Sequence, residues 1–546
     1  MKNARSHRLA AAAVALLMLA AQALGCTQTD PGQTGSPDPS TLVLPTPTPQ
    51  VVPLSGGELT MYMLRNAMSA DPLDVNTEEV LSLYSLVCES LVELDESGML
   101  APCLSSAWQR SETDANTWIF TLRDNVTWHS GEAFTAADVA STVELIRERG
   151  ADCYFYPYIE DIISCSYDAG EPYTLRITFA HSGLSAVKKL VFPIVKTDSL
   201  EGESPIGTGP YAVVSVSDES VRLDANDAWW RRAPYITTVR YLVRDSEEIA
   251  LNSLSAGQLN FMPTSVLYSG SYREEGRLNV MDVLTQNMEV LLFNRDSGPL
   301  RSVDVRRAIA FSIDRSQIIS YVYMNKAHEC DVPIAPDSYA YDGSYKVYDY
   351  NRNQAIVLFD AAGYSDTDGD GKLENVSTGT ELTLRLLVNT VRENTIRVDA
   401  ARYIADQLAE IGVTVEIVEA EYEADGGGEY ARMLRDGEFD IALMGVNTPR
   451  YLDLRAVLSS DGELNYGGYA SQEMDELVDA LYLAQDDAQV RSAAALLMEK
   501  FTDELPFMVM YFRMNSIIYT DQLMGLNAAR KPDILRNIEN WYMYAE

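Results

Sequence analysis

The alternation of apolar and polar residues is sharpest between residues 117 and 139. Trp118 and Phe120 share one face of an alternating segment, which predicts a strand with one buried side. Thr135 precedes a helical pattern with an acid at its third position, so a capped helix is expected to begin there. A second short strand at 126–128, followed by a glycine turn, is predicted between them. The segment contains no evident nucleophile or metal cluster and is interpreted as scaffold.

Strand and helix patterns alternate in the last third of the chain. Strands are predicted at 381–389, 413–418 and 439–444, with helices between them at 398–410 and 430–435. Such a β-α-β-α-β run is expected to form an open parallel sheet with right-handed crossovers. Ligands bind these sheets at the carboxyl ends of the strands, which here means just after Asn389 and just after Met444.

Further elements are predicted on both sides of this run from their apolar periodicity. They are a strand at 58–63, a helix at 78–91, a short strand at 91–94, a strand at 211–216, helices at 473–483 and 487–505, and a strand at 506–511. The Gly207–Gly209 segment lacks the glycine series and the following helix of a nucleotide-binding loop, and it is interpreted as a tight turn.

The first residues have the pattern of an export signal. Lys2, Arg5 and Arg8 precede an apolar segment at 9–21 that is too short and alanine-rich to span a bilayer convincingly. The sequence Ala-Leu-Gly then leads directly to Cys26, which resembles the lipobox of bacterial lipoproteins, so residues 1–26 are interpreted as a lipoprotein signal with Cys26 as the acylated residue. Ordinary secretion, with Cys26 as a bystander, is the alternative.

Residues 27–56 are rich in proline, threonine, serine and glycine, and they are expected to form a disordered tether. Residues 57–546 are numerous enough for two or three domains. No later run is apolar and long enough to span a bilayer. The formal charge of −38 argues against binding to nucleic acid and to an anionic membrane surface, and it does not select a ligand.

A series of short motifs resembles the bacterial extracellular solute-binding proteins of family 5, which are the oligopeptide-, dipeptide- and nickel-binding components of ABC importers. The motifs occur in the family's order between about Gly57 and Asn515. They are ESLV at 89–92, LAP at 100–102, WIFTLR at 118–123, WHSGE at 128–132, TAADV at 135–139, GTGPY at 207–211, NDAWW with APY at 226–235, LSAGQL at 254–259, FN at 293–294, VRRAI with IDR at 305–315, DAAGY with DTDGDG at 360–371, and QLAEIGV at 407–413.

This resemblance implies an α/β fold of two lobes that close on a ligand, the type II, cluster C class of periplasmic-binding-protein-like clamps. Lobe one is expected at 57–290 plus 516–546, with an extra subdomain inserted at about 100–205. Lobe two is expected at 291–515, including the hinge strands. The lobes are expected to be joined near 290–294 and 508–512, and their closure is a hinge motion.

The loop after the strand at 439–444 is the best candidate for specificity. In peptide binders of this family an aspartate in this loop pairs with the free α-amino group of the peptide, and Asp453 is the only carboxylate available for that role here. Asp453 could equally cap a following helix at 454–458. Arg450 could pair with a ligand carboxylate or with Asp453. The full set of ligand-binding candidates is Ser69, Asp71, Tyr84, Asn287, Asn447, Arg450, Tyr451, Asp453, Tyr466 and Tyr469.

Metal and cofactor chemistry has little support in the sequence. Asp366, Asp368 and Asp370 resemble the first half of an EF-hand loop, but Ser377 occupies the position that needs a bidentate glutamate, so calcium there is only a weak candidate. The three histidines after the signal (129, 181 and 328) are scattered, which argues against a histidine-based metal site. No cofactor is expected. Hydrolase motifs are also missing, which argues against an enzyme.

Five cysteines follow Cys26, and two sequence-near disulfides, Cys88–Cys103 and Cys153–Cys165, are conceivable in an exported protein, leaving Cys330 free. The resemblance predicts a monomeric, lipid-anchored extracytoplasmic protein that delivers oligopeptides or dipeptides to a membrane permease and its ATPase. An oligosaccharide or opine as ligand, and a role as a surface peptide or pheromone sensor, remain alternatives.

Overall fold

The computed structural model describes residues 53–65, 71–200, 204–423, 427–527 and 529–544. The predicted signal peptide with Cys26, residues 27–52 of the tether, and the candidate Ser69 lie outside the described residues.

The first sheet has four strands in the order β1-β10-β9-β8. These are β1 (Glu58–Leu64), β10 (Thr238–Arg244), β9 (Ser220–Ala225) and β8 (Tyr211–Val216). β1 and β10 are parallel, and the other two pairs are antiparallel. Helix α2 (Glu78–Val87) contacts β1 and β8 and buries Val80, Leu83 and Leu86 in the core.

Helix α2 ends at Val87, four residues earlier than the prediction of a helix to residue 91. The turn at Gly207–Gly209 lies against the end of the helix, and the Gly209 N–H donates to the Val87 carbonyl at 2.9 Å. A Cβ on residue 207 would lie 1.7 Å from the same oxygen. Because the turn takes the place of the next helical turn, the chain is extended from Cys88 onward, and the predicted short strand follows as β2 (Val92–Leu94).

The second sheet has the order β4-β5-β7-β6, with β4 (Ser105–Arg110), β5 (Thr117–Leu122), β7 (Thr174–Phe179) and β6 (Ile162–Tyr167). The predicted strand is β5, with Trp118 and Phe120 buried. The predicted capped helix is α3 (Ala136–Arg149), in which the Thr135 N–H donates to Asp138 at 2.7 Å. The strand predicted at 126–128 is wrong, because only the single bridge Thr127–Ala133 forms around a tight turn.

The third sheet has seven strands in the order β11-β19-β12-β18-β16-β17, with β13 on β19. They are β11 (Phe261–Thr264), β19 (Phe507–Thr520), β12 (Leu278–Phe293), β18 (Ile441–Asn447), β16 (Thr383–Asn389), β17 (Thr414–Ala420) and β13 (Ala327–Glu329). β16 is parallel to β17 and to β18. With α10 (Thr395–Ala409) and α11 (Glu429–Asp436), these strands confirm the predicted β-α-β-α-β run.

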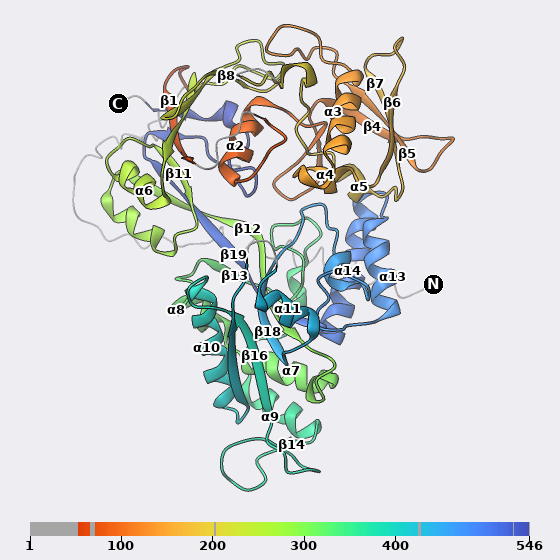
Figure 1. The fold of residues 1–546 in the computed structure, drawn as a ribbon, viewed down its shortest axis with the longest axis vertical. Coiled ribbons are helices and arrows are strands. Elements are labelled where there is room, and N and C mark those ends of the chain that lie inside the picture. Colours follow the sequence, from red (N-terminus) through yellow and green to blue (C-terminus); the bar gives the residue numbers. More distant parts are fainter. Residues whose placement is uncertain (1–52, 66–70, 201–203, 424–426, 528, 545–546) are drawn as a thin grey trace, which may run out of the picture. The chain divides into compact units, whose positions relative to one another are not determined.

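Strands β12 and β19 are the two longest strands, with 16 and 14 residues. They pair antiparallel from Leu278–Thr520 to Leu292–Phe507, with two register shifts. In Figure 1 they run side by side from the region of β11 to the region of β16 and β18. The same two strands therefore connect β11 with the parallel part of the sheet.

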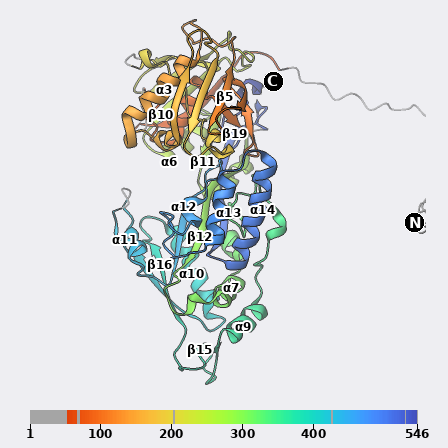
Figure 2. The same cartoon turned by 90° about the vertical axis from the view of Figure 1, so that its right-hand side faces the viewer.

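The remaining helices surround these sheets. Their bounds are α4 (Tyr156–Ile159), α5 (Leu184–Lys188), α6 (Glu247–Ser255), α7 (Val303–Ser312), α8 (Arg315–Tyr321), α9 (Arg352–Ala361), α12 (Arg455–Leu458), α13 (Gln472–Tyr482) and α14 (Asp487–Glu504). The last two confirm the helices predicted at 473–483 and 487–505, and they pack against each other (Figure 2). Three short strand pairs lie outside the three larger sheets, formed by β2 with β3 (Leu100–Pro102), β14 (Tyr364–Ser365) with β15 (Glu374–Asn375), and β20 (Leu523–Met524) with β21 (Tyr542–Met543).

All five described cysteines are free thiols, so the two conceivable disulfides do not form in this structure. The Cys103 Sγ lies 3.9 Å from a carboxylate oxygen of Glu89, and the Cys153 Sγ lies 3.7 Å from the Leu73 carbonyl. Burial raises the pKa of the Cys103 thiol well above its usual value. These thiols are therefore protonated side chains that pack among neighbours other than cysteine.

Candidate binding site

A cavity of about 280 Å³ lies beside helix α2. Its wall is assembled from segments that are far apart in the sequence. Helix α2 contributes Tyr84, the second-sheet region contributes the aromatic segment 154–158, and the loop after β18 contributes Arg450. Trp229 and the segment 532–539 complete the wall. Apolar and aromatic side chains with a few convergent charged groups are the usual lining of a small-molecule site.

The charged groups on the wall form a partly paired network. The Arg231 Nη2 donates to Glu93 at 2.9 Å and lies 3.5 Å from the Cys103 Sγ. The Arg536 guanidinium lies 3.6 Å from a Glu93 oxygen and 3.8 Å from an Asp533 oxygen. The electrostatic interaction between two charges is stronger when they are shielded from bulk water than when they lie on the surface. This network can therefore contribute strongly to ligand selection.

Glu89 is a buried carboxyl group on the same wall. The Trp230 Nε1 donates to both of its oxygens at 3.0 Å. Burial nevertheless raises the pKa of Glu89 to about 7, because the charged form loses more hydration than these hydrogen bonds return. The pKa of Asp533 is also raised, by partial desolvation and by the Glu93 carboxylate, although its side chain is 43% exposed and Arg536 opposes the shift. Glu89 is therefore the carboxyl group of the cavity that exchanges protons near neutral pH.

The loop after β18 reaches across to the segment between β2 and β3. The Arg450 Nη2 donates to the carbonyls of Asp95 and Glu96 at 2.9 and 2.8 Å. The neighbouring Tyr451 ring makes an edge-to-face contact with Tyr158, with ring centroids 6.0 Å apart. This loop therefore closes part of the cavity wall, and Arg450 is held by backbone carbonyls instead of by Asp453.

Asp453 is occupied by neighbours in this structure. The Arg455 Nε and Nη2 donate to its two oxygens at 2.8 and 2.7 Å, and the Arg455 N–H donates to one of them at 3.3 Å. The Lys189 Nζ lies 3.9 Å away. Asp453 does not take the N-cap position of α12, which is Leu454 and has no side-chain cap hydrogen bond; Asp453 accepts instead from the first N–H of the helix, that of Arg455. The pairing of Asp453 with a ligand amine stays a prediction.

The other predicted residues are distributed over several places. Asp71 pairs with Arg149 at 2.6 Å. Asn287 on β12 and Asn447 on β18 are exposed and lie directly opposite each other. Tyr469 is buried, and its hydroxyl bonds to Glu504, away from the cavity wall. Tyr466 is partly buried and packs against the core. Of the candidates that lie in the described residues, the structure brings only Tyr84 and Arg450 onto the wall of the cavity.

A buried ion pair lies at the carboxyl ends of the parallel strands. The Arg397 Nε and Nη2 donate to the two oxygens of Glu289 at 2.9 Å each, and the Nη1 lies 3.3 Å from the Asn389 Oδ1. Arg397 is in the first turn of α10, and Glu289 is on β12. A Cβ on residue 445 would lie 2.7 Å from the Arg397 Nη2, which explains the glycine at that position of β18.

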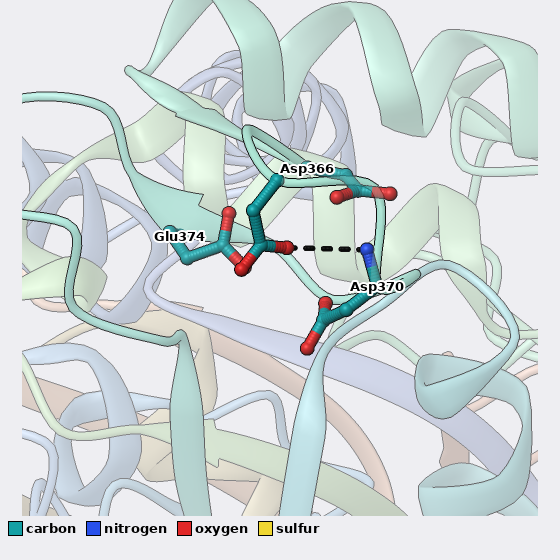
Figure 3. Close-up of side chains that lie close together, drawn as sticks. Asp366, Asp370 and Glu374 are labelled. Atoms are coloured by element: carbon teal, nitrogen blue, oxygen red, sulfur yellow. Dashed lines mark hydrogen bonds between the residues drawn. The ribbon is translucent and has the colours of Figure 1, made fainter.

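The acidic loop brings four carboxylates together. The ligand oxygens of Asp366, Asp368, Asp370 and Glu374 lie within 4.8 Å of one another. Figure 3 shows the side chains of Asp366, Asp370 and Glu374 lying close together. Glu374, the buried member, accepts from the Thr367 N–H at 2.9 Å. Glu374 therefore supplies a fourth carboxylate in addition to the three aspartates, although Ser377 occupies the position of the bidentate glutamate of an EF-hand. Four carboxylates so close together could hold a hard cation such as calcium.

Sequence patterns missed the acids of the cavity. Glu89 lies near the end of the helix predicted at 78–91, and Asp533 lies in a segment for which no helix or strand was predicted. The contact that brings the latter segment to the cavity, between Arg536 and the Leu94 carbonyl, spans 442 positions of sequence. One signal was available in the sequence, the acid of the ESLV motif. It lies in the apolar segment predicted as a helix, and an acid in such a segment enters a core only with a buried partner.

Comparisons with known proteins agree with the geometry. The family model of the bacterial extracellular solute-binding proteins, family 5, matches residues 100–462. The oligopeptide-binding protein AppA of Bacillus subtilis is 24% identical over 516 residues, covering 90% of this chain and 92% of AppA. The structure of that protein in complex with a nonapeptide superposes with a TM-score of 0.65 at 22% identity, covering 90% of this chain and all of the other.

A second solved structure, of a nickel ABC transporter from Bacillus halodurans, has a TM-score of 0.76 at 20% identity and covers 90% of this chain and 99% of its own. In the part of the chain that the structure describes, no helix has both the length and the apolar character needed to cross a membrane. The sheets and helices thus form a mixed α/β fold that is similar to the fold of these solved structures. The chain belongs to family 5 of the bacterial extracellular solute-binding proteins.

Proposed function

We propose that this protein is the solute-binding component of an ABC importer and that it captures peptides in the cavity beside α2. The observation that carries the proposal is the cavity of about 280 Å³, lined by aromatic side chains and by charged groups of both signs, in a chain of family 5. Aromatic walls accommodate varied side chains, while carboxylates and guanidiniums can pair with the two termini of a peptide. Oligopeptide binding in AppA supports the same ligand class.

The capture step is a closure of two lobes about β12 and β19. In this proposal lobe one comprises residues 57–290 and 516–546, with the subdomain at about 100–205, and lobe two comprises residues 291–515. The contacts of Arg450 with the carbonyls of Asp95 and Glu96, and of Tyr451 with Tyr158, are then contacts between lobes that favour the closed form.

The proposed setting is the outer face of a cell membrane, where a monomer anchored through acylated Cys26 delivers its ligand to a permease driven by an ATPase. The sequence from Lys2 to Cys26 supports the anchor, and relatives named as periplasmic support an extracytoplasmic site. Labelling with a fatty-acid analogue tests the anchor, with Cys26→Ser as the unlabelled control.

Native mass spectrometry of the purified protein tests peptide capture. The expected spectrum contains the protein together with adducts of peptide mass, which disappear after unfolding and yield sequenceable peptides. A tightly held sugar or metal complex, with no peptide, would contradict the proposal. Uptake of labelled peptide by cells with and without the protein separates transport from sensing, because a sensor would leave uptake unchanged.

A further inference from the structure

Helix α5 lies at a contact between segments that are far apart in the sequence. The Leu184 N–H donates to the Ala484 carbonyl at 2.7 Å, and the Gln485 Nε2 donates to the Ser182 carbonyl at 3.0 Å. In the proposed division of the chain, residues 182 and 184 belong to lobe one and residues 484 and 485 to lobe two. None of the four lines the cavity. The segment around α5 is therefore a contact surface between the proposed lobes, separate from the cavity.

The side chain of Lys188, the last residue of α5, is buried in this contact surface. Its Nζ donates to the Tyr339 hydroxyl at 2.8 Å and lies 4.3 Å from the centroid of the same ring. Tyr339 belongs to the proposed lobe two, and its N–H donates to the Ser97 carbonyl of lobe one at 2.9 Å. Among the described residues, no carboxylate oxygen lies within 4 Å of the Lys188 ammonium. An ammonium has three N–H donors, so Lys188 is buried with a single neutral acceptor.

Charges at longer range do not compensate for this burial. The groups that face Lys188 are Tyr339, Asp95 after β2, Arg450 after β18, and Asp487 and Arg491 on α14. Burial lowers the pKa of Lys188 from 10.5 to about 8, although the two carboxylates oppose the shift. Separation of the lobes would return the ammonium to water and its pKa to the usual value. The closed form therefore holds this proton less tightly than the open form.

The next residue, Lys189, has the opposite surroundings. Its Nζ donates to Asp161 at 3.1 Å and lies 3.9 Å from an oxygen of Asp453. It also lies 5.4 and 5.5 Å from the ring centroids of Tyr451 and Tyr482. Asp453 and the two tyrosines belong to the proposed lobe two, so the charge of Lys189 is attracted across the contact surface. Two adjacent buried lysines therefore differ in whether the closed form stabilises their charge.

We propose that Lys188 opposes closure of the two lobes and so keeps part of the unliganded protein in an open form that can admit a ligand. Closure removes the ammonium from water and gives it one phenol oxygen in return, which costs free energy that ligand contacts must offset. A ligand shifts such an equilibrium only through its preference for the closed form. Because it concerns the closure of the lobes, this proposal rests on the proposed function and names a residue that sets the equilibrium.

Small-angle X-ray scattering of the unliganded variant Lys188→Met tests the proposal. Methionine has a similar length and no charge, so the ratio of closed to open forms should rise at least about tenfold at pH 7.5, and the radius of gyration should fall. The variant is made in the wild type and in Arg450→Gln, since the fall is visible only where the open form is populated. An unchanged radius of gyration in both backgrounds would overturn the proposal.

Two further variants separate the charge from other effects of the substitution. Lys189→Met removes the attraction to Asp453 and should not lower the radius of gyration. Lys188→Arg keeps a charge that does not titrate, and it should not lower the radius of gyration either. A fall in Lys189→Met as large as the fall in Lys188→Met would overturn the proposal, because any apolar replacement of a lysine next to α5 would then favour closure.

A pH series gives a signature that a packing effect would not produce. As the pH rises from 7.5 to 9.5, Lys188 loses its proton in the closed form before it does so in the open form, so the wild-type ratio of closed to open forms should rise about tenfold or more. Lys188→Met should lack this rise, and an equal rise in both proteins would overturn the proposal. If Lys188→Met does not fold, as judged by circular dichroism, Lys188→Leu replaces it, and a wild-type ratio that does not rise with pH is itself contradictory.

Failure of this proposal differs from failure of the proposed function. If peptides co-purify while the radius of gyration is the same in wild type and Lys188→Met in both backgrounds, peptide capture stands and the role of Lys188 falls. If Lys188→Met closes the protein as expected but no peptide co-purifies, the role of Lys188 stands and peptide capture falls.

Discussion

The contact made by Arg450 gives a prediction about the closure of the cavity. Its Nη2 donates to two carbonyls, those of Asp95 and Glu96, at 2.9 and 2.8 Å. A hydrogen bond from a charged donor contributes about 1.5–3 kcal/mol. Because one nitrogen makes both bonds, we assign about 2 kcal/mol to the pair, near the lower end of that range. Replacing Arg450 with Gln should therefore reduce the ratio of closed to open forms about 30-fold.

Small-angle X-ray scattering of the unliganded protein measures this change as an increase in the radius of gyration. Peptide affinity should fall in parallel, because the open form must first close. The matched control is Arg432→Gln, since Arg432 pairs with Asp436 and Glu438 on the surface of α11. An unchanged radius of gyration together with unchanged affinity in Arg450→Gln would refute the reasoning.

Three further predictions concern stability and are measured by urea unfolding. Gly207→Ala should destabilise the protein by about 3 kcal/mol or more, because the new Cβ would lie 1.7 Å from the Val87 oxygen. The control Gly298→Ala should change the free energy of unfolding much less, because no atom lies within 4 Å of its Cβ. The pKa of Glu89 is raised from 4.5 to about 7, so the folded state binds more protons than the unfolded state between these values. The stability that protonated Glu89 contributes is therefore full below pH 4.5 and is lost as the pH rises through 7. The free energy of unfolding of Glu89→Gln relative to wild type should rise by up to about 3 kcal/mol between pH 5 and pH 8, and a difference that does not change with pH would contradict the assignment. Arg397→Met leaves the buried Glu289 with only the Arg513 guanidinium, 3.9 Å away, and should cost up to about 3–5 kcal/mol. The double variant with Glu289→Gln should recover part of this loss, and no recovery would contradict the ion-pair explanation.

The sequence predicted the elements whose pattern is local. The parallel strands β16, β17 and β18 and the helices between them follow from periodicity over 10–20 residues, and the α3 cap follows from Thr135 and its acid three residues later. The early end of α2 did not follow from a local pattern, because the apolar face continues to Leu91 and only the distant turn at Gly207 stops the helix.

The lining of the candidate cavity was less predictable for the same reason. Tyr84 and Arg450 on its wall were among the candidates from the sequence, but Glu89 and Asp533 come to the wall through contacts between distant segments. The engagement of Asp453, in contrast, could have been anticipated, since Arg455 is two residues away in the sequence and its guanidinium reaches both carboxylate oxygens. An opposite charge nearby in the sequence predicts an ion pair within the protein, and such a pair competes with binding of a ligand to the same carboxylate.

The central claim is that the solute occupies the cavity beside α2, and intrinsic tryptophan fluorescence tests it most directly. Trp229 lines this cavity, and Trp230 donates to Glu89 on its wall. Titration with a peptide that native mass spectrometry identifies should produce a saturable fluorescence change that is strongly reduced in Trp229→Phe. A peptide that binds by calorimetry with the same fluorescence change in wild type and Trp229→Phe, or with no change in either, would contradict the location of the site.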